Sequence, residues 1–149
     1  MADTVNSMIE QIRGLHADLA ERLRLAAATA ENERLRLVLS YLEERERHVD
    51  DALEQYQSSA PRSVLGTAFK TVQGAPFKQC VDMVRVDADD PDDMFNSVLE
   101  MDKCLSAKLR LVSEDALNDD VRGFFVELAE MIDREKKQTV RDAIEMEDL

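Results

Sequence analysis

Apolar residues recur every three or four positions along four long stretches of the chain, and this spacing constrains the fold more than any other feature. An α-helix has 3.6 residues per turn, so this pattern places the apolar side chains on one helix face. The stretches cover about residues 4–28, 33–57, 92–113 and 118–146. The composition agrees, because helix-forming Ala, Leu, Glu and Arg are frequent, while only four Gly and three Pro occur. We therefore expect an all-α protein with little sheet.

Residues with side-chain oxygens mark the expected helix starts. Asn32, Asp90 and Asn118 each stand just before an apolar stripe, and Pro91 follows Asp90. Asn and Asp side chains accept hydrogen bonds from the free backbone N–H groups of a helix start, and Pro fits the first helical position. The short turn before Asn32 makes the first two helices antiparallel neighbours.

A long connection, residues 58–91, separates the second and third expected helices. Its Pro and Gly residues break the helical pattern. Val64, Leu65, Ala68, Phe69 and Val72 predict one short amphipathic helix within it, and a second brief helix is predicted over residues 77–84. The connection is long enough to cross the whole length of a helix. We expect the second and third long helices to run parallel.

The two halves of the chain resemble each other. Residues 23–46 align with residues 109–132, pairing Leu23 with Leu109 and Asn32 with Asn118. The alignment predicts a duplicated helical hairpin within a single domain, residues 1–149. The first hairpin covers residues 4–57, the crossover residues 58–91 and the second hairpin residues 92–147.

Two segments carry a resemblance to a known superfamily: LVLSYLEERERHVDDALEQY and NDDVRGFFVELAEMIDREKKQ. They resemble the second and fourth helices of ferritin-like and rubrerythrin-like proteins. This resemblance implies a ferritin-like four-helix bundle, in which two hairpins are joined by one long crossover. In active members of the superfamily each half contributes a Glu and a Glu-x-x-His motif, which together hold two iron ions for oxygen or peroxide chemistry.

The present sequence departs from that motif in both halves. Aligned on the apolar run, the motif positions fall on Glu46 and Val49 in the second helix, and on Ile132 and Glu135 in the fourth. A shift of one residue recovers a histidine, His48, but it then places an arginine, Arg45, at the carboxylate position. No register gives an intact motif, so we do not expect a conventional di-iron enzyme.

Four polar residues nevertheless fall on or beside the apolar stripes at a similar height: His16, Glu46, Asp102 and Glu135. They could meet inside the bundle. Buried carboxylates are usually paired, hydrogen-bonded or bound to metal, because desolvating a lone charge is costly. One imidazole and three carboxylates would suit iron, manganese or zinc. These four residues are the candidate metal ligands.

Simpler interpretations remain open. The four side chains could lie at the edges of the stripes with their polar ends in water, or His16 could bond one carboxylate. The charged run over residues 43–47 is typical of a solvated helix face with ion pairs between residues four apart.

The formal net charge of −13 argues against nucleic acid and anionic membranes as partners. No apolar run is long enough to span a bilayer, and the first residues are too polar for a signal peptide, so we expect a cytoplasmic protein. Cys80 and Cys104 show no Cys-x-x-Cys spacing. We expect both to be buried, inert thiols rather than a disulfide.

Three functional hypotheses follow. The first is a ferritin-like bundle without an intact di-iron site, non-enzymatic and without a cofactor, which acts through a protein partner or as a homo-oligomer such as a homodimer. The second is a metalloprotein that binds iron, manganese or zinc through His16, Glu46, Asp102 and Glu135. The third is an adaptor whose crossover, residues 62–84, docks on a partner.

Overall fold

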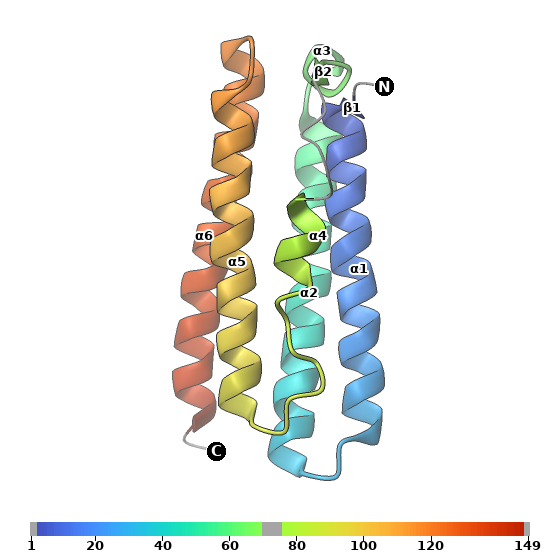
Figure 1. Cartoon of the computed structure of the whole chain (residues 1–149), viewed down its shortest axis with the longest axis vertical. Coiled ribbons are helices and arrows are strands. Elements are labelled where there is room, and N and C mark those ends of the chain that lie inside the picture. The colour runs from blue at the N-terminus through green and yellow to red at the C-terminus, as the bar shows by residue number, and fades with distance from the viewer. Residues whose placement is uncertain (1–2, 70–75, 148–149) are drawn as a thin grey trace.

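The computed structural model describes residues 3–69 and 76–147, and four long helices dominate it (Figure 1). They are α1 (Val5–Thr29), α2 (Glu33–Ser59), α5 (Pro91–Glu114) and α6 (Asp119–Glu147). Their bounds lie within a few residues of those expected from the apolar spacing. Apart from one pair of two-residue strands, the regular structure of the described residues is helical, which confirms the all-α expectation.

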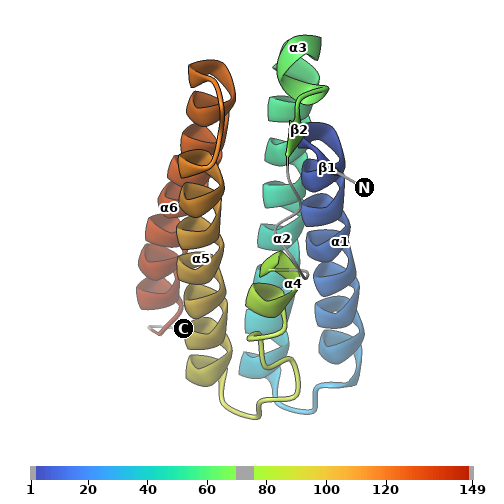
Figure 2. The ribbon, with the colours of Figure 1, turned by 45° about the horizontal axis from the view of Figure 1, so that its top comes forward.

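The long helices form two antiparallel hairpins, α1–α2 and α5–α6, which stand side by side (Figure 2). In Figure 1, α1 descends, α2 rises, the crossover returns to the bottom, α5 rises and α6 descends. Helices α2 and α5 therefore run parallel, as the length of the connection predicts. Within the described part of the chain, no helix combines the length and apolar character needed to cross a membrane.

The expected N-caps are present. The side-chain oxygens of Asn32, Asn118 and Asp90 accept backbone N–H groups two or three residues further on, at 3.1, 2.9 and 2.9 Å. Pro91 occupies the first turn of α5. Each cap satisfies a donor that has no partner within its own helix, so these residues fix where the helices begin.

The first half of the crossover differs from the prediction. A helix of four residues, α3 (Arg62–Leu65), ends at Gly66, and Ala68–Phe69 forms the strand β2. Strand β2 pairs antiparallel with β1 (Asp3–Thr4), which directly precedes α1. The amphipathic helix expected over these residues is therefore wrong beyond α3; Val72 lies outside the described residues. Phe69 instead packs edge-on against Phe125 of α6, with ring centroids 5.4 Å apart.

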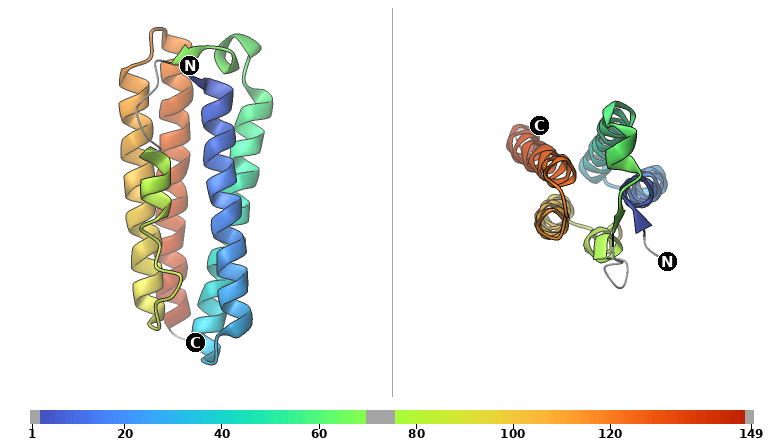
Figure 3. Two further views of the ribbon diagram at one scale, coloured as in Figure 1. Left: turned by 45° about the vertical axis from the view of Figure 1, so that its right-hand side comes forward. Right: turned by 90° about the horizontal axis from the view of Figure 1, so that it is seen from above.

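The second half of the crossover contributes a short helix, α4 (Pro76–Val81), which occupies the predicted region. Seen along the bundle axis, α4 lies between α1 and α5 and contacts both (Figure 3). The side chains of Phe77, Cys80, Val81 and Val84 are buried there. The crossover is thus part of the core and fills the gap between the two hairpins on one side.

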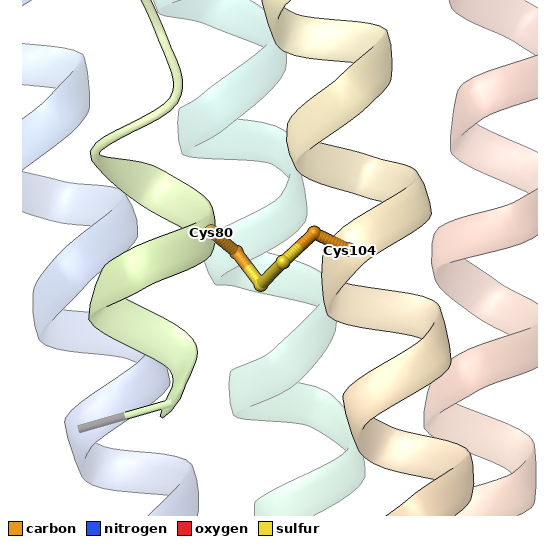
Figure 4. Close-up of a disulfide and its surroundings, with 2 residues drawn as sticks. All are labelled: Cys80 and Cys104. Carbon is orange, nitrogen blue, oxygen red and sulfur yellow. A yellow bond between two sulfur atoms is a disulfide. The ribbon is translucent and has the colours of Figure 1, made fainter. Parts of the chain in front are cut away.

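A disulfide joins the crossover to the second hairpin. Cys80 of α4 and Cys104 of α5 are bonded, with their Cα atoms 5.4 Å apart (Figure 4). The expectation of two separate, inert thiols is therefore wrong. Spacing along the chain did not reveal the pair, because it is the return of the crossover along α5 that brings the two residues together.

Candidate functional site

Five polar side chains meet in the interior of the bundle, each at most 5% exposed. This buried polar cluster consists of His16 from α1, Arg45 and Glu46 from α2, Asp102 from α5 and Thr139 from α6. All four long helices therefore contribute to it. Buried ionisable groups are uncommon unless they are paired, so the contacts within the cluster determine what it can do.

Arg45 is the centre of the cluster. Its Nη1 donates to Glu46 Oε1 at 2.7 Å, its Nη2 donates to Asp102 Oδ2, and its Nε donates to Thr139 Oγ1 at 2.8 Å. One guanidinium thus links three of the long helices. The planar fork of arginine suits this role, because it presents several donors in fixed directions.

His16 joins the cluster through Glu46. Its Nδ1 lies 2.5 Å from Glu46 Oε2, and both side chains are completely buried. Glu46 therefore has both carboxylate oxygens occupied, one by His16 and the other by Arg45. The simpler interpretation that His16 bonds a carboxylate is confirmed, whereas the one that places these polar ends in water is wrong for His16, Glu46 and Asp102.

The helical repeat explains why α2 turns two adjacent charged residues inward. Leu42 and Val49 are fully buried, and Arg45 and Glu46 stand between them, three and four residues after Leu42. Both positions therefore belong to the same face of the helix. The predicted solvated run is correct only in part: Arg47 pairs with Glu43 at 2.9 Å on the surface, but Arg45 and Glu46 belong to the core.

The two buried carboxyl groups, Glu46 and Asp102, differ in their pKa values. Burial opposes the ionisation of Glu46, but the charges of His16 and Arg45 and their hydrogen bonds outweigh it, so the pKa of Glu46 lies below its usual range. Burial also works against the charge of Arg45, yet Glu46 and Asp102 together raise the pKa of the guanidinium. Arg45 and Glu46 are therefore the ion pair of the core.

Asp102 behaves differently. Burial is the main cause that raises the pKa of Asp102 to about 7, and the negative charge of Glu46 adds to it; together they outweigh the attraction of Arg45 and His16. The carboxyl group can therefore hold a proton close to neutral pH. When this proton leaves, the interior gains one negative charge.

Two atoms of the cluster lack hydrogen-bond partners among the described residues: His16 Nε2 and Asp102 Oδ1. Buried polar atoms are usually satisfied by protein or water, so each such atom calls for an explanation. These two atoms are the part of the cluster that could accept a further group.

Glu135, the fourth candidate ligand, is not part of this arrangement. Its carboxylate faces the surface, where Oε1 lies 3.1 Å from Nε2 of the exposed His48. Its backbone carbonyl accepts a hydrogen bond from the Thr139 hydroxyl at 2.9 Å, and the charge of its carboxylate contributes to the raised pKa of Arg45. The structure brings three of the four predicted residues together and leaves Glu135 outside.

A groove between α2 and α6 leads from the surface towards Arg45. It has a cavity volume of about 550 Å³, and Arg45 and Thr139 are among its lining residues. Tyr41 also lines it and donates to Asp142 Oδ2 at 2.5 Å. Burial and this hydrogen bond raise the pKa of Tyr41, so the phenol stays protonated and links α2 to α6.

The cluster as arranged does not fit a metal ion. Among residues 3–69 and 76–147, no three His, Cys, Asp or Glu side chains converge in a way that could hold one. In addition, the cationic guanidinium of Arg45 lies against the carboxylates of both Glu46 and Asp102. A metal ion would have to compete with this guanidinium for the same oxygens.

Arg45 and Thr139 are the members of the cluster that sequence reasoning missed. Arg45 lies inside a charged run, which is typical of a solvated face, and Thr139 lies in the polar last part of α6. A signal was available, because Arg45 falls three residues after Leu42 and Thr139 falls seven residues after Ile132, both on buried faces.

Comparison with known proteins adds no relative. No family model matches the sequence, and no curated protein and no solved structure matches the chain significantly. The geometry of the bundle and its buried polar cluster is therefore the basis for a functional proposal.

Proposed function

We propose that this chain is a ferritin-like bundle in which the guanidinium of Arg45 takes the place of a metal ion, and that the protein is non-enzymatic and acts through contacts with other proteins. The observation that carries the proposal is the bridging position of Arg45 between Glu46 and Asp102. The ferritin-like assignment is supported by two antiparallel hairpins that are joined by a long crossover, so that α2 and α5 run parallel.

The chemistry of the cluster supports a structural role. A buried cation that is satisfied by carboxylates and a hydroxyl has no open position for a substrate. Such a centre can fix the register of the helices, because each helix must supply its own polar side chain at one height. The contacts with other proteins would then be made by surface residues.

The proposal predicts a specific response to the removal of Arg45. In Arg45→Ala, Glu46 and Asp102 lose their shared cation, and the free energy of unfolding should fall by about 3–5 kcal/mol in metal-free buffer. Urea unfolding of the variant and of the native chain in metal-free buffer measures this effect.

Arg47→Ala is the matched control, since Arg47 lies two residues away on the same helix with its side chain 49% exposed. Its stability should change by less than about 1 kcal/mol. If Arg45→Ala were as stable as the native chain in metal-free buffer, Arg45 would not be the counter-ion of the core and the proposal would fail.

A second candidate function is a metalloprotein that uses His16, Glu46, Asp102 and Glu135. The observation in its favour is the pair of unpartnered buried atoms, His16 Nε2 and Asp102 Oδ1. It requires Arg45 to withdraw into the groove between α2 and α6. Glu135→Gln distinguishes the two candidates, because the Glu135 side chain is partly exposed and the substitution keeps its size. Metal uptake by the native chain that is lost in this variant would favour the metalloprotein.

A further inference from the structure

The disulfide attaches a short helix to the side of the bundle. Helix α4 contains only six residues, from Pro76 to Val81. An isolated helix of this length is unstable in water, because too few hydrogen bonds offset the cost of its first turn. Its position therefore depends on two sources: the buried side chains of Phe77, Val81 and Val84, and the covalent bond from Cys80 to Cys104.

Helix α4 covers the side of the bundle that is nearest to two members of the buried polar cluster. It lies against α1 and α5, which carry His16 and Asp102 near their midpoints. Figure 1 shows α4 at the same middle height of the bundle, and Figure 3 shows it closing the gap between these two helices. His16 and Asp102 are the two members of the buried polar cluster that have unpartnered atoms.

The disulfide is also close to the cluster along the chain. Cys104 lies two residues after Asp102 on α5. Cys104 is only partly buried, whereas Cys80 is fully buried. An incoming thiolate would therefore reach the sulfur of Cys104 more easily, and access is one of the factors that control thiol–disulfide exchange.

We propose that the Cys80–Cys104 disulfide is a redox latch, whose reduction by a dithiol releases α4 and opens the side of the bundle between α1 and α5 to water. The first thiolate of the dithiol attacks Cys104 Sγ, forms a mixed disulfide and displaces the Cys80 thiolate, which takes up a proton. The second thiol of the reductant then closes its own disulfide and releases Cys104. Two electrons and two protons pass from the dithiol to the two cysteines.

The redox state of the compartment decides whether the Cys80–Cys104 disulfide can be reduced in the cell. Disulfides of cytosolic proteins are usually transient and redox-sensing, because the glutathione and thioredoxin systems keep thiols reduced. In a reducing compartment of this kind, the Cys80–Cys104 bond would be regulatory rather than purely structural. The latch concerns α4, whereas the proposed metal-free centre concerns Arg45, so each can fail without the other.

Hydrogen exchange of the full chain, oxidised and after treatment with dithiothreitol, tests the latch. The amides of residues 77–84 should exchange roughly tenfold faster or more in the reduced protein, while those of α2 and α6 keep their protection. Alkylation with iodoacetamide under native conditions should label neither cysteine before reduction and both after it. Removal of the reductant and mild oxidation should restore slow exchange.

The double variant Cys80→Ser/Cys104→Ser separates reduction of the latch from other effects of dithiothreitol. It should exchange like the reduced native chain in both buffers. Three results would overturn the proposal: equal protection of residues 77–84 in the oxidised and reduced forms, loss of protection throughout the bundle on reduction, or alkylation of both cysteines in the untreated protein.

Discussion

At the scale of single residues, the protein depends on how one guanidinium balances two carboxyl groups. Arg45 and Glu46 form the buried ion pair, while burial raises the pKa of Asp102 to about 7. Replacing a buried ion pair by apolar residues often leaves stability unchanged, but removing one partner is strongly destabilising. The cluster is therefore best understood as a set of mutually dependent side chains.

The raised pKa of Asp102 predicts how stability changes with pH. The folded chain holds this proton up to about pH 7, whereas the unfolded chain releases it near the ordinary value of 3.8. The stability that neutral Asp102 contributes is therefore complete below pH 3.8 and is lost as the pH rises to about 7. The slope is at most about 1.4 kcal/mol per pH unit.

Asp102→Asn tests this prediction, because asparagine stays neutral and keeps an oxygen for Arg45. Urea unfolding at a series of pH values should show that the native chain loses stability relative to the variant between pH 5 and about 7. Glu46 does not interfere in this range, because its lowered pKa affects stability only below its ordinary value of 4.5. Parallel stability curves for the two proteins would show that Asp102 is ionised throughout.

The sequence revealed those residues of the cluster whose position on an apolar helix face predicts that they are buried. His16, Glu46 and Asp102 interrupt apolar stripes at matching heights, and the structure brings them together. Arg45 was missed because it lies in the charged run 43–47, which was interpreted as a solvated helix face from its residue types and not from its position on the helix. Glu135 was placed at the right height, but its carboxylate faces the surface, a distinction of a fraction of a helical turn.

At the scale of elements, the four long helices follow from local sequence, while the crossover does not. The caps and apolar spacing of α1, α2, α5 and α6 act within a few residues, so the chain alone reveals them. Strand β2 and the disulfide depend on partners far away in the chain: β1 in one case and α5 in the other. Contacts of this kind are decided by the tertiary fold.

Helix α6 exposes two apolar residues on one face, where the homo-oligomer expected from the sequence could form. Val140 and Ile144 are one helical turn apart and are 39% and 60% exposed. We expect a dimer that buries this face, and Ile144→Asp should shift the protein towards monomer in sedimentation velocity, because the interface would then have to desolvate a charge.

Leu117→Asp is the control, because Leu117 lies in the turn before α6 and is 95% exposed. A native chain that sediments as a monomer at micromolar concentration would contradict this prediction.

At the scale of the whole molecule, two similar hairpins enclose a shared interior whose polar centre is supplied by all four long helices. The hairpins stand side by side, and α4 lies between α1 and α5 (Figure 2). Arg45 is among the residues that line the groove between α2 and α6. The duplicated hairpin plan was predictable from the repeat between the two halves. The central cation was not, because a buried arginine becomes visible only when its partners on other helices are in place.

The metal content of the native protein tests the central claim most directly. Elemental analysis of the freshly purified full chain should find far less than one ion of iron, manganese or zinc per chain, because Arg45 already neutralises the carboxylates that would hold it. Any of these metals at one ion per chain or more would contradict the claim that a guanidinium, rather than a metal, occupies the centre of this bundle.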